Sequence, residues 1–114
     1  MSTHEQALGP VFRFLLPSVK LKQPGRTGPT VEQDVHTFLM ATFDGYTATV
    51  GTLFGYWKDS RGEDSYNEHR QFAIACPQQQ VDQLKQYLST LAAQIDEDSI
   101  YLEAAGTATL IYRQ

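Results

Sequence analysis

Three consecutive residues, Glu68, His69 and Arg70, bring an acid, an imidazole and a guanidinium together in the sequence. The reference pKa of histidine is near neutral, so His69 could act as a general base while Glu68 or Arg70 fixes a substrate. Neighbouring strand residues point to opposite faces, so Glu68 and Arg70 would share one face and His69 would take the other. The structural alternative is a charged start to a strand, with an exposed ion pair. The catalytic residues stay unknown from sequence, with these three as candidates.

Aromatic residues precede this triplet at Tyr56, Trp57 and Tyr66. Flat rings can stack on a ligand, although they more often fill a core or an interface between subunits. Strand alternation puts Tyr56 and Trp57 on opposite faces, one of which belongs to the core and the other to an opening or an interface. We therefore expect a small ligand, if there is one, to meet an opening near residues 56–70. The candidate ligand-binding residues are Trp57, Tyr56, Tyr66, Glu68 and Arg70.

Other kinds of site find little support in the residues. His36 has no His or Cys one helical turn further on, so no helical metal pair forms, and we expect neither a metal nor a cofactor. Cys76 ends an apolar stretch and is expected to be a buried small hydrophobe. Lys20, Lys22 and Arg26 put three cations near one loop, which is either a solvated loop or an anion site. A glycine-rich phosphate loop is missing from the sequence.

The composition is typical of one soluble domain. The chain has 114 residues, 41% of them hydrophobic and 19% charged, and a net charge of −4. An acidic chain argues against binding to nucleic acid, and no apolar run reaches the roughly 20 residues that a membrane span needs. The single cysteine and the lack of a secretory signal favour the cytoplasm. We expect residues 1–10 to be frayed and residues 11–114 to form a single domain.

Two amphipathic helices are predicted. Thr30 with Gln33 predicts a capping box at the start of the first, and Asp44-Gly45 ends it, with Gly45 supplying the left-handed conformation. Pro77 starts the second helix, where its missing amide hydrogen matters little. The apolar stripe of this helix recurs at spacings of three and four residues, at Val81, Leu84, Leu88, Leu91 and Ile95.

Strands are predicted before, between and after these helices. Pro17 either ends the first strand or lets it continue as a bent edge, and Gly106 marks either a bulge within the last strand or a tight bend between two. A long aromatic strand and a shorter alternating strand flank a polar loop over residues 59–70. The expected strands cover residues 11–16, 46–58, 71–76, 99–102 and 107–112.

The resulting order, β-α-β-β-α-β, predicts an α+β fold of the ferredoxin-like split β-α-β sandwich type, with both helices on one face of an antiparallel sheet. The other face of such a sheet would be bare. A second copy of the chain would cover it at least cost, since a twofold dimer buries the same surface twice. We therefore expect a homodimer with an α+β barrel type of association.

Short motifs resemble the domain of unknown function 3574 family, a group of small uncharacterised bacterial proteins. The resemblance rests on 43-FDGYT-47, close to the family's F-x-D-G-L-T, on the Gly-x-Trp ending at Trp57, on Gly62, and on Glu68 before the next strand. It covers residues 11–102. The chain departs from the family pattern at its first strand, which lacks the acidic-aromatic lead to a Phe-Gly pair, and at Asn67, where the family commonly has Arg. The resemblance implies a ferredoxin-like α+β fold and no established activity.

These observations favour a noncatalytic homodimeric domain that binds a small ligand by shape and aromatic contact. A cofactor-free enzyme of the oxygenase or isomerase type, using His69 and Arg70, is the alternative class. An accessory subunit of a larger complex is a third, and would leave an apolar sheet exposed even in the dimer. A cavity of a few hundred Å³ beside His69, with His69 pointing inward, would favour the enzyme, and a closed, packed interior there would favour the binding or structural class.

Overall fold

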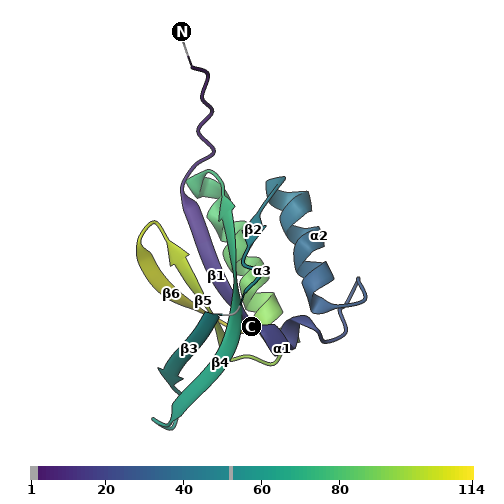
Figure 1. Cartoon of the computed structure of the whole chain (residues 1–114), viewed down its shortest axis with the longest axis vertical. Helices are drawn as coiled ribbons and strands as arrows, with labels where there is room; N and C mark the ends of the chain where they lie inside the picture. The colour runs from purple at the N-terminus through teal and green to yellow at the C-terminus, as the bar shows by residue number, and fades with distance from the viewer. Residues whose placement is uncertain (1–2, 52) are drawn as a thin grey trace.

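Helices packed on one antiparallel sheet form the α+β fold of the chain (Figure 1). The structure is a computed structural model and describes residues 3–51 and 53–114. In this part of the chain the helices are α1 (Ser18–Leu21), α2 (Val31–Phe43) and α3 (Val81–Gln94), with a 3₁₀ turn, η1 (Gln78–Gln80). The strands are β1 (Val11–Pro17), β2 (Thr47–Ala48), β3 (Leu53–Lys58), β4 (Asp64–Ala75), β5 (Ser99–Ala104) and β6 (Thr107–Tyr112). The prediction of an α+β fold built on an antiparallel sheet is confirmed.

The sheet order is β2-β4-β1-β5-β6, and β3 pairs with β4 on the same edge as β2. Strand β1 is central, because it pairs with β4 on one side and β5 on the other. Strands β3 and β4 run on beyond the helices as a two-stranded arm (Figure 1). The arm lies on one side of the central strand β1, and the β5–β6 hairpin lies on the other side.

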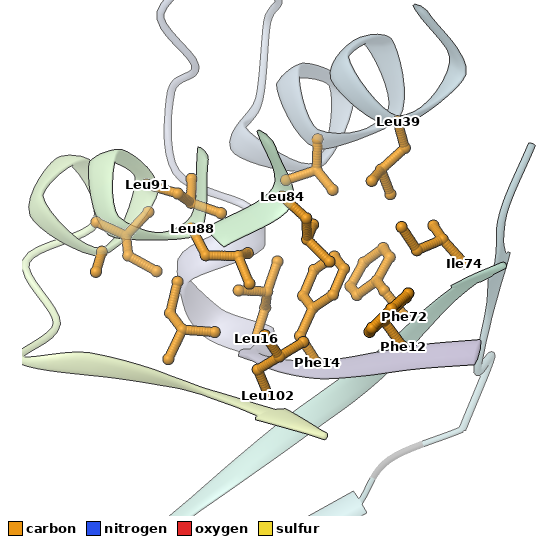
Figure 2. Packing of buried hydrophobic residues seen from close by; sticks show 14 of the residues in the cluster. Phe12, Phe14, Leu16, Leu39, Phe72, Ile74, Leu84, Leu88, Leu91 and Leu102 are labelled. Atoms are coloured by element: carbon orange, nitrogen blue, oxygen red, sulfur yellow. The ribbon is translucent and has the colours of Figure 1, made fainter. Parts of the chain in front are cut away.

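The core lies between the helices and one face of the sheet, as Figure 2 shows. Alternation along β1 sends Phe12, Phe14 and Leu16 to this face, because successive strand residues point to opposite sides. The ring of Phe14 stacks on that of Phe72 in β4, with centroids 5.4 Å apart. Helix α3 adds the apolar stripe that its spacing predicts, and α2 packs beside it on the same side of the sheet. Both helices therefore leave the opposite face of the sheet, here called the open face, uncovered.

Helix α2 begins as predicted and ends differently. Thr30 is the N-cap, and its hydroxyl accepts a hydrogen bond from the amide of Gln33 at 3.2 Å. At the other end Asp44, and not Gly45, takes the left-handed conformation, with φ 64°. Aspartate tolerates this region better than most residues do, so the helix ends one residue earlier than the glycine rule suggests.

The prediction of one strand over residues 46–58 is wrong, because the structure divides it into β2 and β3. Four residues separate Ala48 from Leu53, whereas only two separate their partners on β4, Phe72 and His69. Residues 49–51, here called the bulge, lie between the two strands, and Val50 is 98% exposed. Thr49 anchors the start of the bulge, since its amide donates to the Gln71 carbonyl and its hydroxyl accepts from the Gln71 amide.

The prediction of a polar loop over residues 59–70 is also wrong, because β4 begins at Asp64 and runs for twelve residues. The connection is a tight turn closed by two backbone hydrogen bonds, from Asp59 to the Glu63 carbonyl and from Gly62 to the Asp59 carbonyl. Gly62 has φ 79°, a conformation that glycine adopts without steric cost. The triplet at residues 68–70 thus lies within a strand.

The remaining boundaries resolve what the sequence leaves open. Strand β1 ends at Pro17 and is followed by the short helix α1, which the sequence does not predict. Pro77 precedes the 3₁₀ turn η1, so α3 itself starts at Val81 and not at Pro77. Residues 99–112 form two strands joined by a tight bend, in which Ala105 and Gly106 have φ 52° and 84°.

Candidate functional site

A cavity of about 440 Å³ lies on the open face, between the β3–β4 arm and the β5–β6 hairpin. Its floor comes from Leu15 and Pro17 of β1, which alternate with the core residues of that strand. Pro17 pairs with His69, so the imidazole stands on the same face of the sheet. The walls carry aromatic and polar side chains from separate parts of the chain, at Trp57, Lys58, Asp59, Ser60, Ser65, Asn67, His69, Glu97, Asp98, Ser99, Tyr101, Leu110 and Tyr112.

His69 is a cavity-lining imidazole with a defined protonation pattern. The residue is only 4% exposed, and its Nδ1 lies 3.1 Å from the carbonyl oxygen of Asn67. A carbonyl oxygen can only accept, so Nδ1 carries the hydrogen and Nε2 keeps its lone pair in the neutral ring. Burial lowers the pKa of His69, although the Asn67 carbonyl opposes this by favouring the charged ring. At neutral pH the cavity therefore contains a neutral imidazole with one acceptor nitrogen.

Trp57 packs against this imidazole. The two ring centroids lie 5.1 Å apart with the planes at 67°, an edge-to-face contact. The indole also lies back along its own strand over Gly55, where a Cβ atom would come within 2.5 Å of Cη2 of Trp57. Only glycine at position 55 leaves this space, so the sequence Gly55-Tyr56-Trp57 sets the place of the indole against His69.

Acidic side chains occupy the cavity walls more than basic ones do. Asp59, Glu97 and Asp98 contribute carboxylates, whereas Lys58 is the one cation among the described lining residues and pairs with Asp64. Lys20 approaches Glu97 at 3.9 Å and donates to the Ile95 carbonyl at 2.7 Å. Burial raises the pKa of Glu97, and Lys20 opposes the shift. The cavity thus favours neutral or cationic molecules over anions.

Of the residues that the sequence singles out, the cavity brings together Trp57 and His69. Strand alternation places Tyr56, Tyr66, Glu68 and Arg70 on the other face of the arm. There Phe54, Tyr56 and Tyr66 form an exposed aromatic row, with Phe54 and Tyr66 stacked at 5.5 Å between centroids.

Arg70 has structural contacts on that face. Its Nη1 pairs with Glu32 of α2 at 2.8 Å, its Nε donates to the Thr49 carbonyl at 2.9 Å, and its guanidinium lies 5.5 Å from the centre of the Phe72 ring. Arg70 thereby ties α2 and the β2–β3 bulge to β4.

Sequence reasoning does not single out Tyr101, Tyr112 and Asp98 as site residues. The available signal is alternation in residues 99–112, where Ile100 and Leu102 are buried and the residues between them face the other way. Tyr101 and Tyr112 follow from that alternation once β5 and β6 are known to pair, since Ser99 lies opposite Tyr112.

Within residues 3–51 and 53–114, no group of three or more His, Cys, Asp or Glu side chains is placed to hold a metal ion. No helix in these same residues is long and apolar enough to cross a membrane. Cys76 is buried, as its sequence context predicts.

Comparison with known proteins gives a likeness of fold. No family model matches the chain, and no curated protein matches it. A solved structure described as a phage SAM lyase in its apo state matches with a TM-score of 0.58 and 14% sequence identity, over 100% of this chain and 97% of that chain. A phage SAM lyase in complex with S-methyl-5′-thioadenosine matches with a TM-score of 0.51 and 15% identity, over 97% of this chain and 96% of that one. At these identities the chain shares with the phage enzymes its α+β fold along nearly its whole length.

Proposed function

We propose that this protein binds a small, ring-bearing molecule in the cavity on the open face of its sheet. The observation that carries the proposal is the cavity itself, about 440 Å³ in volume, with Trp57, Tyr101 and Tyr112 beside the buried His69. Small-molecule sites are typically clefts of about 300–1,000 Å³ that combine aromatic walls with a few polar groups. The protein would bind its ligand by aromatic contact with Trp57 and by hydrogen bonds to the polar wall.

The ligand class that we favour is a nucleoside. A purine can stack on aromatic rings, and a ribose presents hydroxyl groups that suit Ser65, Asn67 and Ser99 on the cavity wall. One of the phage SAM lyases with this fold is described in complex with S-methyl-5′-thioadenosine, which is a nucleoside. These points support S-methyl-5′-thioadenosine and SAM as first probes.

A ferredoxin-like topology and a homodimer belong to the same proposal. The order β2-β4-β1-β5, with α2 between β1 and β2 and α3 between β4 and β5, supports the split β-α-β assignment. The open face carries exposed apolar side chains at Val11 and Leu110, and the exposed Arg13 lies between Val11 and the partly buried Leu15. A second copy packed on this face would cover them.

The first prediction tests where the ligand binds. Saturating S-methyl-5′-thioadenosine should raise the thermal midpoint of the wild type, because a ligand that binds only the native state stabilises it. Trp57→Ala should lose the shift, because it removes the ring that lies beside His69. The measurement is a thermal-shift titration, repeated by calorimetry with both probes.

Tyr56→Ala is the matched control, since it removes an aromatic ring from the same strand on the opposite face. It should keep the ligand-induced shift. The reverse result, with binding lost in Tyr56→Ala and kept in Trp57→Ala, would move the site to the aromatic row with Tyr66, Glu68 and Arg70. No shift with either probe would leave the nucleoside class unsupported.

A cofactor-free enzyme is the second candidate function, and the criterion set from the sequence favours it, because a cavity of about 440 Å³ opens beside the buried His69. A neutral imidazole with a lone pair on Nε2 can act as a general base. Incubation with SAM, followed by chromatography of the reaction mixture, tests this candidate. Consumption of SAM by the wild type and not by His69→Gln would support it, and unchanged SAM would count against it.

A further inference from the structure

The polar groups of the cavity differ in what they offer to a ligand. Asp59, Glu97 and Asp98 carry carboxylates, which accept hydrogen bonds when ionised, and Lys58 is paired with Asp64. His69 is the buried member of this set, and its Nε2 has no hydrogen-bond partner in residues 3–51 and 53–114. A ligand that fills the cavity must therefore satisfy Nε2 or leave it buried without a partner, which is costly.

We propose that His69 is the residue that determines ligand specificity in this cavity, by accepting through Nε2 a hydrogen bond from an N–H or O–H group of a neutral or cationic nucleoside-type ligand. This inference rests on the proposed function and adds the group that selects the ligand. Neutral His69 rejects a molecule that offers an acceptor at this point, because two acceptors would face each other without water. The carboxylates reject phosphorylated ligands in the same cavity.

Geometry keeps the acceptor in place. The Asn67 carbonyl holds the hydrogen on Nδ1, and the edge contact with Trp57 restricts rotation of the imidazole. On the β1 side the neighbours are the uncharged Leu15 and Pro17. The charged groups that face the cavity are Lys58 and Asp59 at the end of the arm and Glu97 and Asp98 before β5, with the phenols of Tyr101 and Tyr112 on the hairpin.

Protonation would reverse the role of His69. A proton on Nε2 converts the acceptor into a donor, so a ligand donor would meet a second donor. Binding should then weaken as the pH falls below neutrality. Glutamine at position 69 separates this effect from others, since its side-chain oxygen can accept in place of Nε2 and does not titrate.

The test is calorimetric titration of the wild-type chain with S-methyl-5′-thioadenosine from about pH 7.5 to about pH 4.5, a range that extends well below the ordinary pKa of histidine because burial lowers the pKa of His69. The wild-type Kd should rise at least about fivefold over this range, and His69→Gln should bind within about threefold of the wild type at the upper pH and lose most of the pH dependence. His69→Leu should bind at least about tenfold more weakly than the wild type at the upper pH and show little pH dependence, since it can neither accept a hydrogen bond nor take up a proton. Adenosine should bind more tightly than adenosine 5′-monophosphate, which adds only a phosphate.

The outcomes separate the two proposals. No binding of either nucleoside at any pH overturns the proposed function. The role of His69 alone is overturned if His69→Leu binds the ligand as the wild type does, or if His69→Gln keeps the full pH dependence of binding. The titration would then belong to Glu97, because burial raises the pKa of that carboxyl group. Thermal unfolding of each variant without ligand shows whether it is folded, so a loss of binding by unfolding is recognised.

Discussion

The side chain that most firmly fixes the local structure is the carboxylate of Asp34 on α2, which is only 9% exposed. It accepts hydrogen bonds from the amides of Arg26 at 2.6 Å, Thr27 at 3.1 Å and Gly28 at 2.7 Å, and from the Thr27 hydroxyl at 2.8 Å. The loop before α2 thus binds an anion from its own chain. These contacts use the amides of residues 26–28 and not the side chains of the three cations, so the sequence alternative of an anion site at Lys20, Lys22 and Arg26 stays a prediction.

Burial alone would raise the pKa of Asp34, but the hydrogen bonds from Gly28, Arg26 and Thr27 outweigh it and hold the pKa well below 3.8. Asp34→Asn should lower the free energy of unfolding at neutral pH by about 2–3 kcal/mol, because hydrogen bonds to a charged group are lost. Urea denaturation measures the change. Asp82→Asn, on the exposed first turn of α3, is the control and should change it by less than about 0.5 kcal/mol.

The role of Asp34 can also be tested through the pH dependence of the free energy of unfolding. Unfolded Asp34 takes up a proton at a higher pH than folded Asp34 does, so the stability it contributes is complete above its unfolded pKa. That contribution falls as the pH drops from about 4 towards the folded value. The Asn variant should therefore lose part of the acid-induced destabilisation of the wild type. An identical acid profile in both proteins would show that Asp34 is not held ionised in the folded state.

At the scale of elements, the sequence predicts the buried parts well and the exposed arm poorly. The apolar residues of α3 repeat with helical spacing, and those of the inner half of β4 alternate along the strand. Both sets face the core, so the sequence pattern predicts both elements. The outer half of β4 pairs only with β3 and lies beyond the helices, and polar residues such as Asn67 stand among its aromatics. The more buried face of this half carries the polar residues Ser65, Asn67 and His69, so the strand has no hydrophobic period to detect, which is why residues 64–70 read as a loop.

The arm offers a prediction about its glycines. Gly55→Ala should displace the indole of Trp57, because the new Cβ would lie 2.5 Å from Cη2. Trp57 is the only tryptophan, so its fluorescence reports the change directly, and we expect an altered emission maximum and weaker ligand binding. Gly51→Ala is the matched control, since nothing lies within 4 Å of a Cβ added there. Equal spectra for Gly55→Ala and the wild type would show that the indole does not lie over Gly55.

For the whole molecule, the cavity is the feature that is hardest to predict from the sequence. Its walls come from β1, the arm, the connection before β5 and the final hairpin, which are distant in sequence. Trp57 and His69 could be selected because they stand near one another in the chain and have distinctive chemistry. Tyr101 and Tyr112 could not, because their place depends on the twist and pairing of the entire sheet. The sequence nevertheless predicts two helices on one side of the sheet, and this leaves free the opposite face, where the cavity lies.

That face also carries the prediction of a homodimer. Val11 lies on the central strand, is 42% exposed and points to the open face without lining the cavity. Light scattering after size exclusion should give the wild type a mass of twice 12.8 kDa. Val11→Lys should return the mass to that of one chain, because a buried, unpaired ammonium is strongly unfavourable in an interface. Val19→Lys, at a valine that is 66% exposed on α1, is the control and should stay dimeric. A wild-type mass of one chain, or a Val11→Lys protein that remains a dimer, would show that the open face is not a dimer interface.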